Sequence, residues 1–194
     1  MESIVKRWIF DFLKWKQKAR LLEKIVVLFI FALLTGVSAQ IFIKLPFTPV
    51  PITGQVFMVL LSGVLLGKKH GCLSQMIYIV GGIAGIPWFS GGKSGFLFIP
   101  TFGYIIGFVP AAWIVGYLYE RNVRNIRECI FAMLVGIAII YLFGAAWFSL
   151  LLGTNLEETI KMAVVPFIPF DILKAYLAGY FAFYLFSKTD QNML

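Results

Sequence analysis

The chain alternates long apolar blocks with short segments rich in glycine, proline and charged residues. Six blocks are long enough, or nearly so, to cross a hydrocarbon core of about 30 Å as α-helices that rise about 1.5 Å per residue. They cover approximately residues 25–43, 50–67, 72–89, 97–119, 129–152 and 163–186. We therefore predict an all-α integral membrane protein whose six transmembrane helices form one bundle.

Residues 1–24 differ from the six blocks because they are rich in Lys and Arg. Apolar residues between Ile4 and Trp15 recur at near-helical spacing with basic residues on much of the other face, a pattern typical of a helix in the lipid headgroup layer. A disordered basic tail is the alternative, since isolated short helices are marginally stable. We predict a basic amphipathic arm (1–24), a transmembrane substrate-binding domain (25–186) and a short cytoplasmic tail (187–194).

The first block has a second interpretation, because Val37-Ser38-Ala39 resembles a signal-peptide cleavage site. The long basic region before it and the equally apolar later blocks favour a retained helix. Composition agrees with the membrane assignment: 60% of the 194 residues are hydrophobic and 13% are charged, against roughly 45–50% and about 25% in soluble domains. The spans leave no room for a soluble catalytic or ATP-hydrolysing domain, so we expect no enzyme.

The formal net charge of +8 has a topological explanation, because the basic residues lie between apolar blocks and no motif for nucleic-acid recognition is present. With the N-terminus inside, thirteen of the 17 Lys and Arg residues fall on the inner side. These are Lys6, Arg7, Lys14, Lys16, Lys18, Arg20, Lys24, Lys68, Lys69, Arg121, Arg124, Arg127 and Lys188. Only Lys44, Lys93 and Lys161 fall outside. We predict a multi-pass cell-membrane protein with both termini in the cytoplasm.

Cys72, Cys129 and the single histidine, His70, offer almost no ligands for a metal or redox site, and we expect none. Small residues four apart recur along the spans, for example Gly63/Gly67 and Ala112/Gly116. They allow helices to approach closely, either inside one bundle or against another membrane protein. If such residues contact another membrane protein, the docking face for this partner consists of Ala32, Gly36 and Ala39.

Asp171 and Lys174 are the only charged residues inside a predicted span. Such residues are costly in lipid and usually mark a substrate or ion site in the interior of a bundle. Their spacing places them on one helix face, and Pro169 can begin the helix, which puts Asp171 in the positive first turn. Pro166 and Pro169 also predict an irregular outer part of this span. The alternative is a structural ion pair that joins helices.

Two outer loops carry the remaining candidate chemistry. Residues 85–100 combine glycines such as Gly92 with Trp88, Phe89 and Lys93. We interpret this loop as a lid, in which the aromatic side chains cover an apolar ligand and Lys93 attracts an anionic group of that ligand. An interfacial aromatic belt gives the same composition. The loop 45–55 is stiffened by three prolines and leads to Thr53 and Gln55, polar groups at a pocket mouth.

Three segments resemble the biotin-specific S components of energy-coupling-factor (ECF) transporters, the BioY family. The first is Pro46-Phe-Thr-Pro-Val-Pro-Ile-Thr-Gly-Gln55 followed by Leu-Leu-Ser-Gly-Val-Leu-Leu-Gly67. The second is the loop 82–95 followed by Pro100-Thr-Phe-Gly-Tyr-Ile-Ile-Gly-Phe108, and the third is Pro169-Phe-Asp171-Ile-Leu-Lys174. The resemblance covers roughly residues 25–186.

The resemblance implies that the protein captures biotin from outside and releases it inside when driven by partner subunits, a transmembrane coupling subunit and ATPases. No cofactor is expected, since only the partners use ATP. We assign Asp171 to the ureido N–H, Lys174 to the ureido oxygen and Lys93 to the carboxylate. The alternative, in which Lys93 binds the ureido oxygen and Lys174 the carboxylate, is equally compatible with the sequence. The remaining pocket residues are Gln55, Trp88, Phe89, Gly92 and Tyr104.

Two other functions compete with biotin uptake. An ion- or proton-coupled secondary transporter of a small carboxylate-bearing solute would use Asp171 as its titrating group, but no other span carries an ionisable residue. An intramembrane enzyme would need a nucleophile and a base within the spans, and these hold no His and a single carboxylate.

Overall fold

The computed structural model describes residues 20–95, 98–121 and 125–190, and side chains as far as residue 184. The fold is helical, with one small β-ribbon. Most of the predicted arm (1–24) and the end of the predicted tail lie outside the described residues. The helices are α2 (Leu21–Ala39), α3 (Gln55–Ile83), α4 (Phe102–Glu120), α5 (Ile126–Leu152), α6 (Leu156–Ala163) and α7 (Ile168–Asp190), with a 3₁₀ turn at Val165–Phe167.

The ribbon consists of β1 (Phe42–Ile43) and β2 (Ile52–Thr53), which pair antiparallel with Phe42 opposite Thr53. The predicted helix 25–43 therefore extends too far at its C-terminal end, and the predicted helix 50–67 begins too early. Pro46, Pro49 and Pro51 lie between the strands, and proline removes the backbone donors that a helix needs. The segment forms a loop closed by the ribbon.

Gly67 divides α3 into two halves, because its backbone (φ 78°, ψ 174°) is not helical. The halves, 55–66 and 68–83, lie side by side: Gln75 Nε2 is 3.1 Å from Ser62 Oγ, and Gln55 Nε2 is 2.6 Å from Tyr78 Oη. In one straight helix the second pair would be about 34 Å apart, at about 1.5 Å per residue. The chain therefore reverses at Gly67, between the second and third predicted spans.

Helix ends follow local sequence signals. Asn125 and Asn155 cap α5 and α6 by accepting hydrogen bonds from the backbone N–H groups of Glu128 and Glu158, at 3.0 and 2.9 Å. The second half of α3 ends at residue 83, short of the predicted 89, because Gly85 adopts a φ of 110° and Pro87 follows. Helix α4 begins at residue 102 rather than 97, after Pro100.

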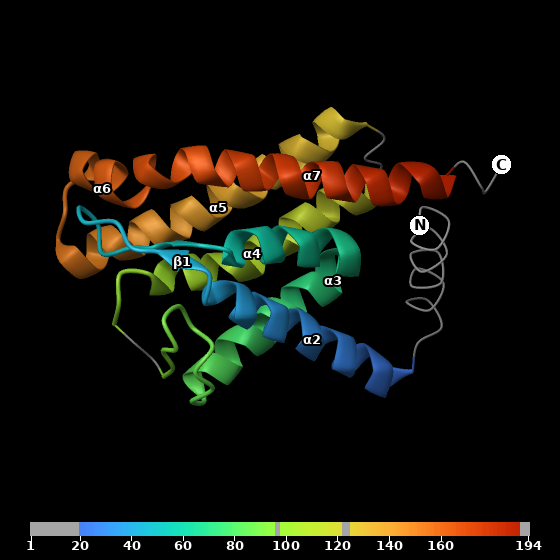
Figure 1. Cartoon of the computed structure of the whole chain (residues 1–194), viewed down its shortest axis with the longest axis horizontal. Coiled ribbons are helices and arrows are strands. Elements are labelled where there is room, and N and C mark those ends of the chain that lie inside the picture. The colour runs from blue at the N-terminus through green and yellow to red at the C-terminus, as the bar shows by residue number, and fades with distance from the viewer. Residues whose placement is uncertain (1–19, 96–97, 122–124, 191–194) are drawn as a thin grey trace.

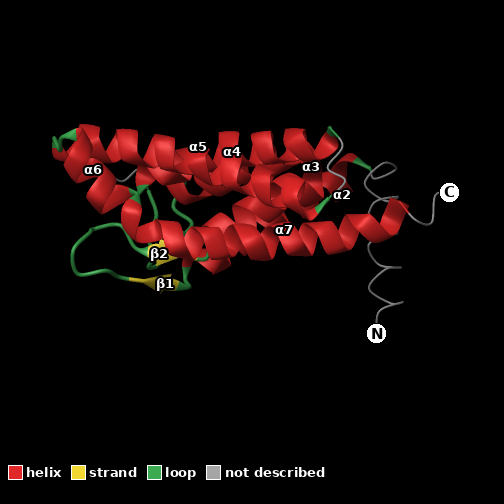
Figure 2. Cartoon of the chain, turned by 90° about the horizontal axis from the view of Figure 1, so that it is seen from above, coloured by secondary structure: helices red, strands yellow, loops and turns green. Residues whose placement is uncertain are grey.

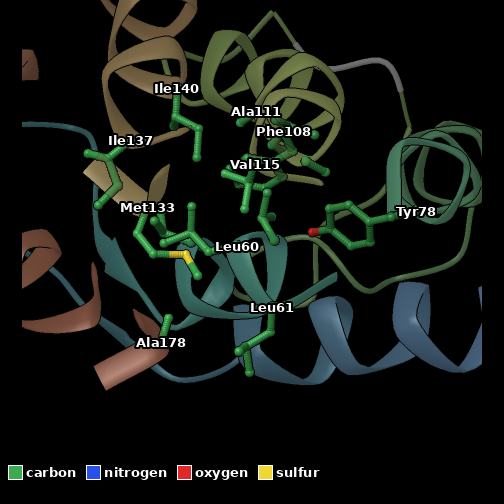
Figure 3. Packing of buried hydrophobic residues seen from close by; sticks show 14 of the residues in the cluster. Leu60, Leu61, Tyr78, Phe108, Ala111, Val115, Met133, Ile137, Ile140 and Ala178 are labelled. Carbon is green, nitrogen blue, oxygen red and sulfur yellow. The ribbon is translucent and has the colours of Figure 1, made fainter. Parts of the chain in front are cut away.

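The core lies between α3, α4 and α5. Leu60 of α3, Val115 of α4 and Met133 of α5 meet there (Figure 3) and are buried. Small residues let the backbones approach: a Cβ on Gly63 would lie 2.6 Å from the carbonyl oxygen of Ala112. The contact between Gly63 and Ala112 therefore shows that small residues of α3 and α4 serve packing within the bundle.

The predicted docking face on α2 is also internal, which is a correction. Ala32 and Ala39 have no exposed surface, and a Cβ on Gly36 would lie 2.8 Å from the Cβ of Trp88. The face is occupied by the protein's own loop and α3, so it is not available to a partner in this conformation. The opposite face of α2, which includes Phe29 and Leu33, is exposed.

The two ends of the bundle can be followed in Figures 1 and 2. The start of α2 and the end of α7 lie at one end, and α6 lies at the other. The turn at Gly67 is next to the end of α4, where Lys68 Nζ lies 3.1 Å from Glu120 Oε2. Among the residues that the structure describes, five helical segments are long and apolar enough to cross a membrane: Leu21–Ala39, Gln55–Ile83, Phe102–Glu120, Ile126–Leu152 and Leu156–Tyr184.

Candidate functional site

A cavity of about 490 Å³ opens near α6, between the β-ribbon loop, the loop after α3, and helices α4, α5 and α7. This volume is within the range of small-molecule sites. Polar residues that line it are Lys44, Thr48, Thr53, Gln55, Ser90, Lys93, Thr101, Tyr104, Tyr141, Asp171 and Lys174. Its walls are otherwise mostly apolar, which is typical of a site that combines shape with a few fixed polar contacts.

Asp171 and Lys174 form an ion pair in the wall of this cavity. Lys174 Nζ lies 2.7 Å from Asp171 Oδ1, and the exposed fractions of the two side chains are 16% and 5%. Tyr141 of α5 donates a hydrogen bond of 2.7 Å to the other carboxylate oxygen, Oδ2. As predicted, Asp171 is in the first turn of α7, where the helix dipole favours a negative charge.

The position of the pair depends on the irregular segment before it. Phe167 ends the 3₁₀ turn at Val165–Phe167, and Pro169 then occupies the first turn of α7, where its missing N–H costs nothing. The predicted irregular outer part of this span is thus confirmed. Tyr104 of α4 braces the segment by donating its hydroxyl to the carbonyl oxygen of Ala163, and it also lines the cavity.

The carboxylate and the ammonium group together present both kinds of hydrogen-bonding partner. A carboxylate has about four acceptor positions and an ammonium group three donors, and their mutual bond with the Tyr141 contact uses only part of them. A ligand with an N–H beside a carbonyl group can therefore bind both residues at once. Because a buried ion pair contributes little net stability, its place in a cavity favours a binding role.

Gln55 contributes to the cavity from another element, at the start of α3. Its side chain is buried and oriented by two hydrogen bonds: Oε1 accepts from Thr53 Oγ1 at 3.0 Å, and Nε2 donates to Tyr78 Oη at 2.6 Å. Gln55 and Thr53 both line the cavity. The ribbon and the hairpin at Gly67 thus bring together polar groups from two separate segments.

The predicted lid is a short hairpin, in which Phe89 and Lys93 face each other as an antiparallel bridge. Both residues line the cavity, together with Ser90 and Gly91. Phe89 is buried and packs against Gly82, while Lys93 is exposed at the mouth. A cation in this position is accessible to the charged tail of a ligand.

Trp88 and Gly92 are not among the residues that line the cavity. Trp88 packs behind the lid, where it is buried against Gly36 and Gly81, and its Nε1 donates to the carbonyl oxygen of Tyr78 at 2.9 Å. Gly92 is at the exposed tip and donates its N–H to Gln40. Both residues shape the lid without contacting the cavity.

Comparison with known proteins places this architecture in a family. The BioY family model matches residues 12–190. This chain belongs to the BioY family. It is 41% identical over 155 residues to the probable biotin transporter BioY of Pyrococcus horikoshii, with 79% of this chain and 90% of that one covered. It is 36% identical over 155 residues to the biotin transporter BioY of Thermotoga maritima, covering 79% and 89%.

The fold also matches a solved structure described as the S-component for biotin from an ECF-type ABC transporter. The TM-score is 0.76 at 25% identity, with 84% of this chain and 90% of that chain covered. Family membership and the five apolar helices identify a multi-pass membrane protein of the cell membrane. Its helical fold is that of an S component.

The sequence analysis did not single out several polar residues of this BioY cavity, among them Tyr141 and Lys44. Tyr141 appeared only as part of an apolar span, although a hydroxyl there was a weak signal. Lys44 was used only for topology, yet it lines the cavity, as Lys93 does. In the part of the chain that the structure describes, no three His, Cys, Asp or Glu side chains come together as metal ligands.

Proposed function

We propose that this chain is the membrane-embedded biotin-binding component of an ECF transporter, which takes biotin from outside the cell and releases it inside. The names of its BioY relatives and of the matching S-component structure support this assignment. Its role is then binding and transport rather than catalysis. The observation that carries the proposal is the Asp171–Lys174 pair in the wall of a cavity within an apolar bundle.

The chemistry of biotin suits this pair. Its ureido group carries two N–H donors on either side of one carbonyl acceptor, so a carboxylate and an ammonium group side by side can bind one N–H and the oxygen together. Asp171 would accept from a ureido N–H and Lys174 would donate to the ureido oxygen. The 2.7 Å between their charged groups favours this assignment over the exchange of the two lysines.

The remaining parts of biotin have suitable partners elsewhere in the cavity. Its bicycle and chain are apolar, and the walls provide Val56, Ile105, Phe108 and Ile140. Its carboxylate would reach Lys93 at the mouth, and Lys44 is a second exposed lysine in the cavity lining. Gln55, Phe89 and Tyr104 would complete the pocket, and Trp88 and Gly92 would act through the lid.

The two halves of α3 are proposed to cross the membrane separately, which gives six crossings with both termini in the cytoplasm. The distribution of basic residues supports this orientation. The sequence holds no Gly-x-x-x-x-Gly-Lys-Ser/Thr loop, so ATP hydrolysis would belong to partner subunits and this chain would need no cofactor. A transmembrane coupling subunit and ATPases are the proposed partners.

The direct test is biotin binding to the purified protein without ATP or an ion gradient. We expect stoichiometric binding by the natural sequence. The variant Asp171→Asn keeps the size of the side chain but removes its charge and one acceptor. A hydrogen bond to a charged group contributes about 1.5–3 kcal/mol, so affinity should fall on the order of 10- to 150-fold.

Glu157→Gln is the matched control, because Glu157 is an exposed carboxylate paired with Lys161 on α6, outside the cavity lining. This variant should bind biotin normally. Lys174→Met should weaken binding at least as much as Asp171→Asn, since it leaves Asp171 without its counter-charge. Absence of biotin binding by the natural sequence would contradict the proposal, and so would uptake driven by an ion gradient without ATP.

A further inference from the structure

The hairpin at residues 88–93, which we call the flap, is a part of the cavity wall that lies outside the helices and the β-ribbon. It follows the end of α3 and is held internally by the Phe89–Lys93 bridge. Its positions 91 and 92 are glycines with φ of 76° and 71°, so side chains contribute little at the tip. The flap therefore needs contacts from elsewhere to stay over the cavity.

Gln40, at the C-terminal end of α2, provides such contacts through both ends of its side-chain amide. Nε2 lies 3.2 Å from the carbonyl oxygen of Trp88 and 3.2 Å from that of Phe89. Oε1 accepts a hydrogen bond of 3.1 Å from the N–H of Gly92. Nε2 also donates to the carbonyl oxygen of Gly36 at 3.0 Å, which anchors the side chain to its own helix.

An amide is the chemical group that these contacts require. The contacts call for a donor toward the carbonyl oxygens of Gly36, Trp88 and Phe89 and for an acceptor toward the N–H of Gly92, which also donates to the carbonyl oxygen of Phe89. Glutamate has no donor when ionised and lysine has no acceptor. Asparagine is one methylene group shorter, so it cannot span the same distance. Gln40 therefore matches the base and the tip of the flap simultaneously.

The flap is also connected to the cavity wall. Tyr78 Oη donates to the carbonyl oxygen of Trp88 at 3.3 Å and accepts from Gln55 Nε2 at 2.6 Å. Gln55 lines the cavity. A continuous set of hydrogen bonds thus joins a cavity residue, the base of the flap and α2.

We infer that Gln40 is a positioning residue that holds the flap closed and so controls how fast a bound ligand leaves. The identity of that ligand as biotin rests on the proposed function. The flap contributes Phe89, Ser90, Gly91 and Lys93 to the cavity, so its release would open one wall. Gln40 itself does not line the cavity, which separates its role from direct binding.

The test compares Gln40→Met, which preserves the length of the side chain, and Gln40→Glu, which removes the donors, with the natural sequence. Ile41→Ala is the control, because Ile41 is the exposed neighbour of Gln40. Backbone hydrogen exchange over residues 88–95 is measured without ligand, and biotin association and dissociation rates are measured separately. Loss of several hydrogen bonds should accelerate both flap exchange and dissociation by about 10-fold or more.

The outcomes separate this inference from the proposed function. Faster exchange confined to the flap, together with faster dissociation and undiminished association, supports it. Unchanged exchange, faster exchange throughout the chain, or unchanged dissociation overturns it. If the natural sequence binds no biotin, the proposed function fails, but the exchange measurement still shows whether Gln40 holds the flap.

Discussion

Asp171 depends on its neighbours for the geometry of its carboxylate. Lys174 occupies one oxygen and Tyr141, from a different helix, occupies the other. The two contacts fix the direction of the remaining acceptor positions. In the proposed complex Lys174 also binds the ligand directly, whereas Tyr141 acts only by orienting the carboxylate. Pre-organisation of this kind reduces the cost of ordering side chains on binding.

The Tyr141→Phe variant isolates this contribution. It removes one charge-assisted hydrogen bond and leaves the ion pair in place, so biotin affinity should fall by about 10-fold. Titration calorimetry on the purified protein measures the change. Tyr180→Phe serves as the control, because Tyr180 is exposed on α7. Equal affinities for Tyr141→Phe and the natural sequence would show that the Tyr141 hydroxyl has no part in binding.

Lys93 allows a separate prediction, because its expected partner is the carboxylate of biotin and not the ureido group. Lys93→Ala should weaken binding of biotin several-fold while scarcely affecting a neutral biotin amide. Lys161→Ala, a basic residue on α6 outside the cavity lining, is the control. Equal losses for biotin and its amide would contradict the assignment of Lys93, and the same comparison on Lys44→Ala tests whether the second lysine shares the carboxylate.

Sequence reasoning found the charged pair because ionisable residues within a span are rare and costly. It could not place Trp88, since an aromatic residue beside a lid has the same sequence pattern whether it lines a cavity or packs behind it. The slot for its indole ring is made by Gly36 and Gly81. Those glycines come from two different helices, so the contact depends on the tertiary arrangement.

At the scale of elements, the hairpin of α3 depends on one backbone conformation. Gly67 has φ 78° and ψ 174°, a region that is essentially restricted to glycine. Gly153 at the end of α5 also has positive φ, but its values of 66° and 22° lie in the left-handed helical region, which asparagine tolerates. The two glycines should therefore respond differently to the same substitution.

We expect Gly67→Asn to cost about 1–3 kcal/mol of stability and Gly153→Asn to be nearly neutral. At roughly 2–4 °C per kcal/mol for a chain of this size, the first variant should lower the melting temperature by several degrees. Thermal unfolding in detergent measures both. Similar melting temperatures for the two variants would show that the reversal at Gly67 does not require a glycine.

The existence of the helices could be predicted from long apolar blocks, whereas their ends could not. The β-ribbon has two residues in each strand, too few for an alternating pattern to be recognised. Helix α6 was not predicted separately because it directly precedes the apolar block of α7. The reversal within α3 was anticipated by the charged residues Lys68 and Lys69 between two apolar blocks, and Gly67 is its structural cause.

At the scale of the whole molecule, the small-residue face of α2 lies inside the bundle. A substitution on this face therefore tests folding rather than partner docking. Ala32 and Gly36 pack within the monomer, so bulky residues at these positions would disturb the fold before they affected a partner. Sequence spacing indicates that two helices approach closely, but it does not reveal whether the second helix belongs to the same chain. The distinction requires the arrangement of the complete bundle.

The orientation of the bundle gives the last prediction. Ser90 lies at the cavity end and the end of α7 lies at the opposite end, while inner loops are expected to hold most Lys and Arg residues. A cysteine introduced as Ser90→Cys should therefore react with an impermeant thiol reagent applied outside intact cells.

A reporter fused after Leu194 should be cytoplasmic. Cys72 and Cys129 lie near the starts of the second half of α3 and of α5. These helix ends are on the inner side in the proposed orientation, so the unmodified chain should stay unlabelled by the reagent applied outside. Labelling of Ser90→Cys only after permeabilisation would reverse the orientation, and with it the side from which the cavity receives its ligand.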